Sequence, residues 1–302
     1  MNIEPMLFCL ILGCLISLLL IPLMLLPGLH RSLPWMKHQC NENEHSGNEN
    51  ESPVPRLGGV ALAAAFIAVS LLICFLYPAT WVNEGRIILG IGWTALAMFF
   101  VGLWDDFRPL GIKRKLLIQT LISIAACLQG VHLEAFGDLL RGFFSHLGAW
   151  AGVFTVLWLL ALTNLFHRMN SINGLAGGVG LVLMTLLAYT SAGTSAGFSA
   201  LCAIGMAGAL LGFLIYNLPP ARIYLGSGGA GLIGFLIANF SIVHPDKETT
   251  MAAVLVLVLP LLGAGLAILP IAPKTSPAAP ASLKIQQRRL KDSGFTRTRD
   301  RS

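Results

Sequence analysis

The sequence predicts an all-α protein that crosses a membrane many times. Hydrophobic residues make up 55% of its 302 residues and charged residues only 11%, whereas a soluble domain carries about 25% charged residues. The apolar residues are gathered into long runs, and a membrane-spanning helix needs about 20 of them. We therefore expect a polytopic helical membrane protein with about nine transmembrane helices.

Nine apolar runs account for the predicted spans, each bounded by charged, glycine-rich or proline-rich residues. They lie near residues 6–26, 57–77, 87–104, 116–133, 148–166, 174–193, 197–217, 228–244 and 251–272. We do not expect the first run to be a cleaved signal peptide, because it lacks a basic start and no small-residue cleavage site follows it.

The distribution of basic residues predicts the orientation of the chain. If the N-terminus is outside, the inner loops and the C-terminal tail hold 17 of the 20 lysines and arginines, and only Arg86, Arg141 and Lys247 fall outside. The positive-inside rule then places the N-terminus outside and the C-terminus in the cytoplasm, with the chain in the cell (inner) membrane. The net charge of +6 reflects this orientation, so nucleic acid is not an expected partner.

The chain is expected to form one transmembrane helical domain over residues 1–272, followed by a basic cytoplasmic tail over residues 273–302. Residues 38–52 are a polar, low-complexity insertion in the first inner loop, and their composition predicts disorder. The six cysteines show neither a disulfide framework nor the paired spacing of a metal site.

An acidic pair, Asp105 and Asp106, stands at the end of the third predicted span. Arg108 and the basic run 113–115 follow within one loop. Carboxylates are ligands of Mg²⁺, and a basic run behind them suits a phosphate. A polar helix end in which Asp106 pairs with Arg108 fits the same residues, so the pattern alone leaves both interpretations open.

Three other predicted inner loops carry motifs. Residues 53–59 lead into the second span and include Arg56, which is suited to hold a phosphate. Residues 164–178 are rich in amides and glycine, which must face protein or water rather than lipid. Residues 217–231 end in a glycine cluster at the eighth span. Backbone N–H groups there are able to receive an anion, or the glycines simply permit close helix packing.

Taken together and in this order, the four loops resemble the polyprenyl-phosphate N-acetylhexosamine-1-phosphate transferases of glycosyltransferase family 4, which include the phospho-N-acetylmuramoyl-pentapeptide translocases. The resemblance runs from about Pro53 to the C-terminal tail. The family's proline-arginine-glycine entry matches residues 55–59, and its acidic pair with a following lysine and glutamine matches Asp105, Asp106, Lys115 and Gln119. Its Asn-rich loop matches residues 164–178, and its Asn-x-Pro-Pro-Ala-Arg stretch matches residues 217–222.

The resemblance implies an integral-membrane enzyme with its active-site loops on the cytoplasmic face. It would move a sugar-1-phosphate from a UDP-N-acetylhexosamine to polyprenyl (undecaprenyl) phosphate, releasing UMP, in cell-envelope polysaccharide synthesis. The implied catalytic residues are Asp105, Asp106 and Lys115, with weakly held Mg²⁺ on the two carboxylates and Lys115 as the phosphate cation. The implied substrate-binding residues are Arg56, Asn164, His167, Asn170, Asn173, Arg222, Ser227 and Lys284. A polyprenyl phosphate lipid and a UDP-sugar are the implied partners, and a homodimer is compatible with this assignment.

The chain departs from the family's pattern at positions that carry chemistry. In the Asn-rich loop, the family's second asparagine and its aspartate are His167 and Asn170. A metal-ligand carboxylate of the fourth loop is replaced by Ser227, and the acid that follows a proline in the ninth span is replaced by Gly263. Near the C-terminus, Lys284 stands where the family's histidine motif begins.

These departures indicate relaxed or altered chemistry, and they leave two hypotheses. The first is an active sugar-1-phosphate transferase with a rearranged site. The alternative is a catalytically impaired pseudoenzyme of the same fold that binds lipid phosphate or a partner enzyme. A third hypothesis, transport of a lipid-linked sugar, has less support because no predicted span carries a paired charge at its centre.

Overall fold

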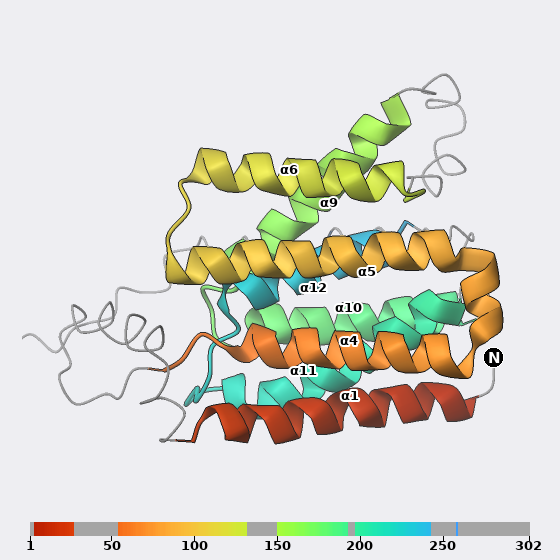
Figure 1. The fold of residues 1–302 in the computed structure, drawn as a ribbon. Helices are drawn as coiled ribbons and strands as arrows, with labels where there is room; N and C mark the ends of the chain where they lie inside the picture. Colours follow the sequence, from red (N-terminus) through yellow and green to blue (C-terminus); the bar gives the residue numbers. More distant parts are fainter. Residues whose placement is uncertain (1–2, 27–53, 132–149, 193–196, 243–257, 259–302) are drawn as a thin grey trace, which may run out of the picture. The chain divides into compact units, whose positions relative to one another are not determined.

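The structure is a computed structural model that describes residues 3–26, 54–131, 150–192, 197–242 and 258. Within these residues it contains eight helices and no strand, which confirms the predicted all-α class for this part of the chain (Figure 1). The helices are α1 (Ile3–Met24), α4 (Gly58–Leu76), α5 (Pro78–Phe107), α6 (Ile112–Leu128), α9 (Trp150–Met169), α10 (Leu175–Ser191), α11 (Gly197–Asn217) and α12 (Gly226–Phe240). All eight belong to one compact unit, Met1–Leu266.

The first eight predicted apolar runs each coincide with one of these helices. Among the described residues, five helical segments are long and apolar enough to cross a membrane: Glu4–Met24, Gly58–Leu76, Gly85–Phe107, Gly152–Met169 and Gly197–Asn217. Helices α10 and α12 are apolar but shorter. The ninth run, the insertion at 38–52 and the tail at 273–302 lie outside the described residues, apart from Val258. The count of nine spans and the domain boundaries therefore stay predictions.

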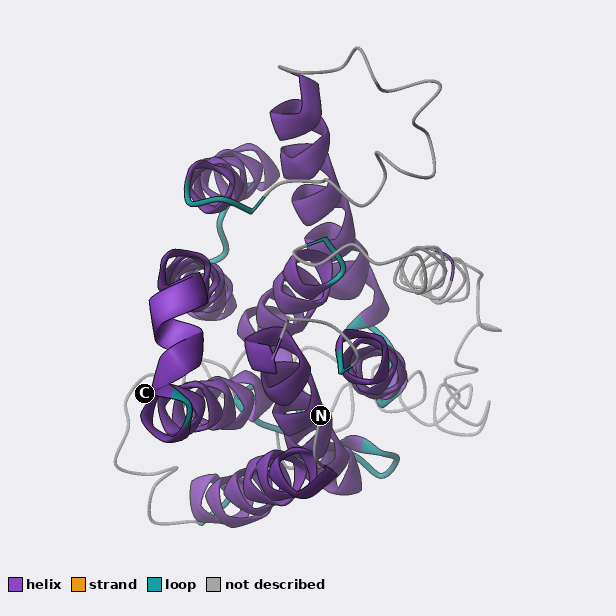
Figure 2. Ribbon diagram, turned by 90° about the vertical axis from the view of Figure 1, so that its right-hand side faces the viewer, coloured by secondary structure: helices purple, strands orange, loops and turns teal. Residues whose placement is uncertain are grey.

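Two helices, α11 and α12, form the centre of the bundle. Helix α11 packs against α1, α10 and α4, and α12 packs against α5, α9 and α4. Every residue of α12 except Ser227 is buried, as expected of a helix that is apolar all round. Figure 2 shows several of the helices end-on, so they share a common direction, whereas α9 crosses its neighbours obliquely in Figure 1.

Helices α5 and α12 approach each other closely at Gly102. A Cβ atom at this position would lie 2.5 Å from the carbonyl oxygen of Ser227 and 2.7 Å from the Cα atom of Gly228. Small residues allow such backbone contact between apolar helices. The contact places the last turn of α5 beside the first turn of α12.

Helix α5 ends at Phe107 because a proline follows two residues later. Arg108, the residue before Pro109, has an extended backbone with φ −135° and ψ 102°, the conformation that the residue preceding a proline favours. Helix α6 begins at Ile112, directly after Gly111. This short connection places the acidic pair in the last turn of one helix and Lys115 in the first turn of the next.

Candidate active site

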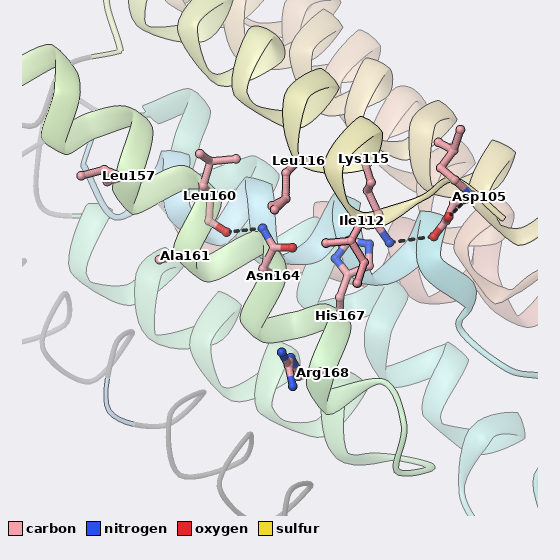
Figure 3. Close-up of a pocket in the computed structure, with 11 residues that line it drawn as sticks. Asp105, Ile112, Lys115, Leu116, Leu157, Leu160, Ala161, Asn164, His167 and Arg168 are labelled. Atoms are coloured by element: carbon pink, nitrogen blue, oxygen red, sulfur yellow. Dashed lines mark hydrogen bonds and ion pairs between the residues drawn. The ribbon is translucent and has the colours of Figure 1, made fainter.

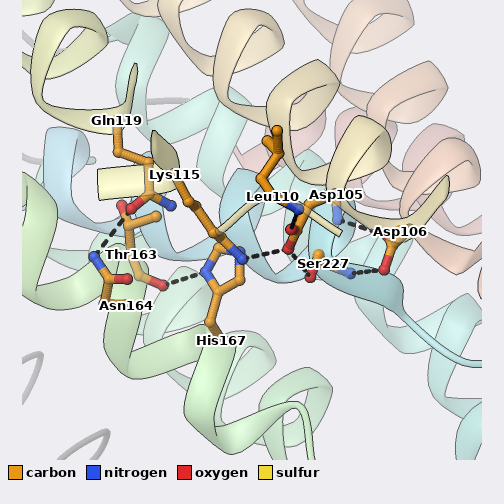
Figure 4. Close-up of polar contacts among 10 residues, drawn as sticks. Asp105, Asp106, Leu110, Lys115, Gln119, Thr163, Asn164, His167 and Ser227 are labelled. Carbon is orange, nitrogen blue, oxygen red and sulfur yellow. Dashed lines mark hydrogen bonds and ion pairs between the residues drawn. The ribbon is translucent and has the colours of Figure 1, made fainter. Parts of the chain in front are cut away.

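Asp105 is held by three hydrogen-bond donors (Figure 4). The Nζ atom of Lys115 lies 2.7 Å from its Oδ2 atom, and the backbone N–H of Leu110 donates to its Oδ1 atom at 2.9 Å. The hydroxyl of Ser227 donates to Oδ2 at 3.3 Å. The side chains of Lys115 and Asp105 are only 17% and 16% exposed. This ion pair is therefore less screened by solvent than an ordinary surface pair.

Asp106 binds the N-terminus of α12. Its Oδ1 atom accepts the backbone N–H of Ser227 at 2.9 Å, and its Oδ2 atom accepts the N–H of Gly228 at 3.1 Å. The first N–H groups of a helix have no partner within the helix, and the helix dipole favours a negative charge beside them. Gly226 makes this approach possible, because its φ is +75° and a Cβ atom would lie 2.7 Å from the carboxylate.

These contacts answer two questions that the sequence left open. The glycine cluster of the fourth loop does present N–H groups to an anion, and that anion is the side chain of Asp106. The same glycines also pack closely, since a Cβ atom at Gly229 would lie 2.8 Å from the Cα atom of Gly59. The other interpretation of the acidic pair was a polar helix end in which Asp106 pairs with Arg108. In the structure the hydrogen bonds of Asp106 go to α12 instead, and Arg108 is exposed.

A cavity of about 760 Å³ lies where the end of α5, the start of α6 and the second half of α9 come together (Figure 3). This volume is within the range of small-molecule sites. Part of its wall is charged or polar and the rest is apolar. The polar residues are Asp105, Lys115, Asn164, His167 and Arg168, and the apolar ones are Leu110, Ile112, Leu116, Leu157, Leu160 and Ala161.

Helix α9 contributes the amide of Asn164 to the cavity. Its Nδ2 atom donates to the Oε1 atom of Gln119 at 3.2 Å and to the carbonyl oxygen of Leu160 at 2.8 Å. Gln119 is 1% exposed, and a buried amide that lost its partner would be costly. The hydrogen bond therefore ties α6 to α9 and sets the orientation of the Asn164 amide.

Helix α9 also contributes an imidazole. The Nδ1 atom of His167 lies 2.8 Å from the carbonyl oxygen of Thr163. Its other ring nitrogen, Nε2, is buried and has no hydrogen-bond partner.

Five described residues that were expected to bind substrate are not among those that line the cavity: Arg56, Asn170, Asn173, Arg222 and Ser227. The hydroxyl of Ser227 instead donates to Asp105, which does line it. Arg56 is exposed and lies within electrostatic reach of Asp106. Asn173 and Arg222 are exposed as well, and Asn170 is half-buried. Lys284 lies outside the described residues. The expected roles of these residues stay predictions.

Hydrogen bonds join three of the predicted inner loops to one another. The N–H of Gly59 donates to the carbonyl oxygen of Leu225 at 2.9 Å, which joins the first loop to the fourth. The Oδ1 atom of Asn217 accepts the N–H of Gly174 at 2.9 Å, and its amide donates to the carbonyl oxygen of Ile223 at 2.9 Å. Asn217 therefore acts as a structural link between the third and fourth loops.

Sequence reasoning missed Arg168 and the apolar wall of the cavity. Leu157, Leu160 and Ala161 recur with Asn164 at the spacing of one helical face, and a period of about 3.6 residues is the signal for such a face. The signal was therefore present in the sequence, but an apolar face in a predicted span fits contact with lipid equally well.

The sequence of the chain also matches the model of a known family. The sequence model of glycosyl transferase family 4 matches residues 88–244, more than half of the 302 residues. The matched segment contains the acidic pair, Lys115 and all of α9 and α12. The chain belongs to glycosyl transferase family 4. This finding confirms the resemblance on which the sequence analysis relied.

Several named relatives are similar to the chain over part of their length. The "probable undecaprenyl-phosphate N-acetylglucosaminyl 1-phosphate transferase" of Bacillus subtilis (strain 168) is 28% identical over 204 residues, which cover 67% of this chain and 55% of the relative. The phospho-N-acetylmuramoyl-pentapeptide-transferase of Clostridium botulinum (strain Eklund 17B / Type B) is 30% identical over 205 residues, covering 64% and 60%. The protein of that name from Listeria monocytogenes (serotype 4b, strain CLIP80459) is 29% identical over 222 residues, covering 66% and 64%. The chain thus matches less than two thirds of the length of each of these relatives.

Proposed function

We propose that this chain is a membrane transferase that moves a sugar-1-phosphate from a UDP-N-acetylhexosamine to polyprenyl phosphate and releases UMP. One observation carries the proposal. The Asp105–Lys115 ion pair lines the same cavity as apolar side chains of α6 and α9. A charged centre beside an apolar wall suits a reaction between a water-soluble diphosphate and the phosphate of a lipid.

The reaction needs one phosphoryl transfer. An oxygen of the polyprenyl phosphate forms a bond to the β-phosphorus of the UDP-sugar. The bond from this phosphorus to the oxygen that bridges to the α-phosphate breaks, and UMP leaves with that electron pair. Charge spread over the transferring group is stabilised by a fixed cation. We assign this role to Lys115, because its ammonium is the basic group nearest to Asp105.

The ion pair also indicates how the site responds to substrate. In the ligand-free chain Lys115 neutralises Asp105. A diphosphate entering the cavity competes for the ammonium, and Asp105 then becomes available as a ligand or as an acceptor for a proton of the acceptor phosphate. Asp106 holds the start of α12 and keeps Ser227 against Asp105.

The residues fit a divalent ion that depends on substrate. Mg²⁺ typically rests on one or two carboxylates together with substrate phosphates, and it would neutralise charge on the diphosphate when bound. Within the part of the chain that the structure describes, no group of three or more His, Cys, Asp or Glu side chains is arranged to hold a metal. We therefore propose that Mg²⁺ is held weakly, by Asp105 with Asp106 close by, and that the UDP-sugar supplies much of its coordination.

We further propose that the cavity opens at the cytoplasmic face of the inner membrane, with the N-terminus outside and the C-terminus inside. The asymmetry of basic residues supports this orientation. It would expose the site to soluble UDP-sugars and to the headgroup of the lipid acceptor.

The direct test is UMP release by the purified chain, with a panel of UDP-N-acetylhexosamines, undecaprenyl phosphate and Mg²⁺. We expect turnover with at least one sugar, and Lys115→Met should lower it by about 10²-fold or more, as loss of one charge-stabilising group does. The matched control is Lys113→Met, two residues earlier on the same helix. Lys113 is exposed and does not line the cavity, so this variant should stay within about threefold of the parent chain. Equal losses in the two variants would contradict the role of Lys115.

The pseudoenzyme alternative is favoured by one observation. The carboxylate of Asp106 is engaged by two N–H groups of α12, which leaves Asp105 as the carboxylate that lines the cavity. If the alternative holds, the purified chain will bind undecaprenyl phosphate saturably but release no UMP from any sugar in the panel. UMP release that depends on Lys115 would exclude it.

A further inference from the structure

One nitrogen of the His167 imidazole is left without a partner in the cavity. The Nδ1 atom lies 2.8 Å from the carbonyl oxygen of Thr163. Since a carbonyl only accepts hydrogen bonds, Nδ1 must carry the proton, and Nε2 then presents a bare lone pair. Nε2 is buried and unpaired, and leaving a buried acceptor unsatisfied is unfavourable. The position therefore favours a ligand that accepts a lone pair.

The surroundings of this nitrogen identify the kind of ligand. His167 lines the cavity together with Asp105 and Lys115, and the charges of both lie within electrostatic reach of the ring. Figure 3 shows the Lys115 amino group between the imidazole and the carboxylate of Asp105, and in Figure 4 the same amino group overlaps the edge of the ring. In the ligand-free chain, a cation thus lies between a carboxylate and a nitrogen lone pair.

The imidazole ring of His167 also packs against helix α12. A Cβ atom at Gly231 of α12 would lie 3.2 Å from the Cε1 atom of His167, so the glycine leaves just enough room for the imidazole. Histidines that bind metals almost always donate their other ring N–H to a carboxylate, a water or a backbone carbonyl, which fixes the tautomer and orients the ring. The hydrogen bond from Nδ1 to Thr163 has this arrangement.

We propose that Nε2 of His167 and the carboxylate of Asp105 ligate the same divalent ion, which replaces the Lys115 ammonium between them. The nitrogen donor would let the site take a transition-metal ion such as Mn²⁺ as well as the Mg²⁺ of the proposed function, because imidazole suits transition metals whereas Mg²⁺ prefers oxygen. The inference rests on the proposed function only in that a diphosphate completes the coordination and takes up the displaced Lys115.

The test uses the purified full-length chain, carrying a tag without histidine, with Mn²⁺ and inorganic pyrophosphate. Pulsed electron paramagnetic resonance detects the ¹⁴N modulation of an imidazole bound to Mn²⁺. We expect this modulation in the parent chain and its loss in His167→Asn, together with Mn²⁺ binding weakened by about tenfold or more. The matched control is His146→Asn, the same substitution at another histidine of the chain, which should keep both the modulation and the affinity.

A second variant separates the proposed site from a purely structural histidine. Lys115→Met removes the ammonium that competes for Asp105, so Mn²⁺ should bind this variant more tightly than the parent chain when pyrophosphate is absent. If His167 is a ligand, adding His167→Asn to Lys115→Met should remove most of this gain, whereas a purely structural role for His167 predicts that the gain remains. If His167→Asn does not fold, His167→Gln takes its place.

Each remaining outcome decides against the proposal. Mn²⁺ bound through oxygen alone, modulation that survives in the His167 variants, or no Mn²⁺ binding with pyrophosphate would overturn it. The result is distinguishable from that of the proposed function. UMP release without nitrogen modulation would support the transferase function and exclude His167 as a metal ligand. Modulation without UMP release would support His167 as a ligand and exclude the transferase function.

Discussion

Replacing Asp106 with alanine is expected to destabilise the helical bundle more than replacing Asp105. Asp106 accepts two backbone N–H groups at the start of α12, at 2.9 Å and 3.1 Å. A hydrogen bond to a charged group contributes about 1.5–3 kcal/mol, and a helix N-cap about 0.5–2 kcal/mol. Because these contributions overlap and Ser227 is only half-buried, we expect Asp106→Ala to lower the free energy of unfolding by about 3 kcal/mol.

Two comparison variants make the expectation specific. Asp106→Asn keeps one acceptor oxygen, so its loss should be about half as large. Asp105→Ala removes the ion pair with Lys115 and the hydrogen bonds from Leu110 and Ser227. Because Lys115 and Leu110 line the cavity, water can replace the carboxylate there, so we expect a smaller loss of about 1 kcal/mol.

The assay is thermal unfolding in detergent, followed by the reaction of buried thiols with a fluorogenic maleimide. Cys9 on α1 and Cys202 on α11 are buried and free, so they become reactive when the bundle opens. At about 2–4 °C per kcal/mol, Asp106→Ala should lower the apparent Tm by about 6 °C or more. An apparent Tm within 1 °C of the parent chain (about a third of a kcal/mol), or a larger fall for Asp105→Ala, would refute the reasoning.

Four further expectations follow from the same geometry. Gly102→Ala should destabilise the bundle by about 1–3 kcal/mol through contact with α12, whereas Gly92→Ala on the same helix has no atom within 4 Å of its Cβ position and should be neutral or slightly stabilising; equal apparent Tm values would contradict this. Gln119→Ala and Asn164→Ala should each reduce UMP release, and their effects should be non-additive by about 0.5–3 kcal/mol because the two side chains share a hydrogen bond; strict additivity in a double-mutant cycle would argue against coupling. Calorimetric titration with Mg²⁺ alone should detect little binding, and tight binding without substrate would place the metal site elsewhere. Reporter fusions in the loop between α5 and α6 and in the C-terminal tail should report the same face of the membrane; opposite faces would disprove the topology.

The helices of this chain follow from local features of its sequence. Apolar runs of sufficient length predict eight of the observed helices, because a segment in lipid must satisfy its backbone hydrogen bonds internally. Helix-breaking residues set where the helices end. Pro109, for example, terminates α5 just beyond the acidic pair. The proximity of Asp105 to Lys115 is equally local, since one short connection separates them.

The sequence alone does not distinguish the roles of the two adjacent carboxylates. Neighbouring residues on a helix point about 100° apart, so the two carboxylates meet different surroundings. The backbone N–H groups that bind Asp106 belong to Ser227 and Gly228, which lie more than a hundred residues further along the chain. Only the packing of α12 against α5 turns Asp106 toward the helix start and leaves Asp105 on the cavity.

His167 likewise has some features that the sequence shows and others that depend on how the helices pack. The family resemblance made it a candidate substrate-binding residue, because the motif around it is visible in the sequence. The carbonyl of Thr163, which fixes the proton on Nδ1, lies one turn earlier on the same helix. The surroundings of the ring, by contrast, include Gly231 and Lys115 from other helices. The sequence by itself therefore determined the class, the helices and the candidate residues. The tertiary structure decided their partners, because hydrogen bonds between distant segments exist only once the helices have packed.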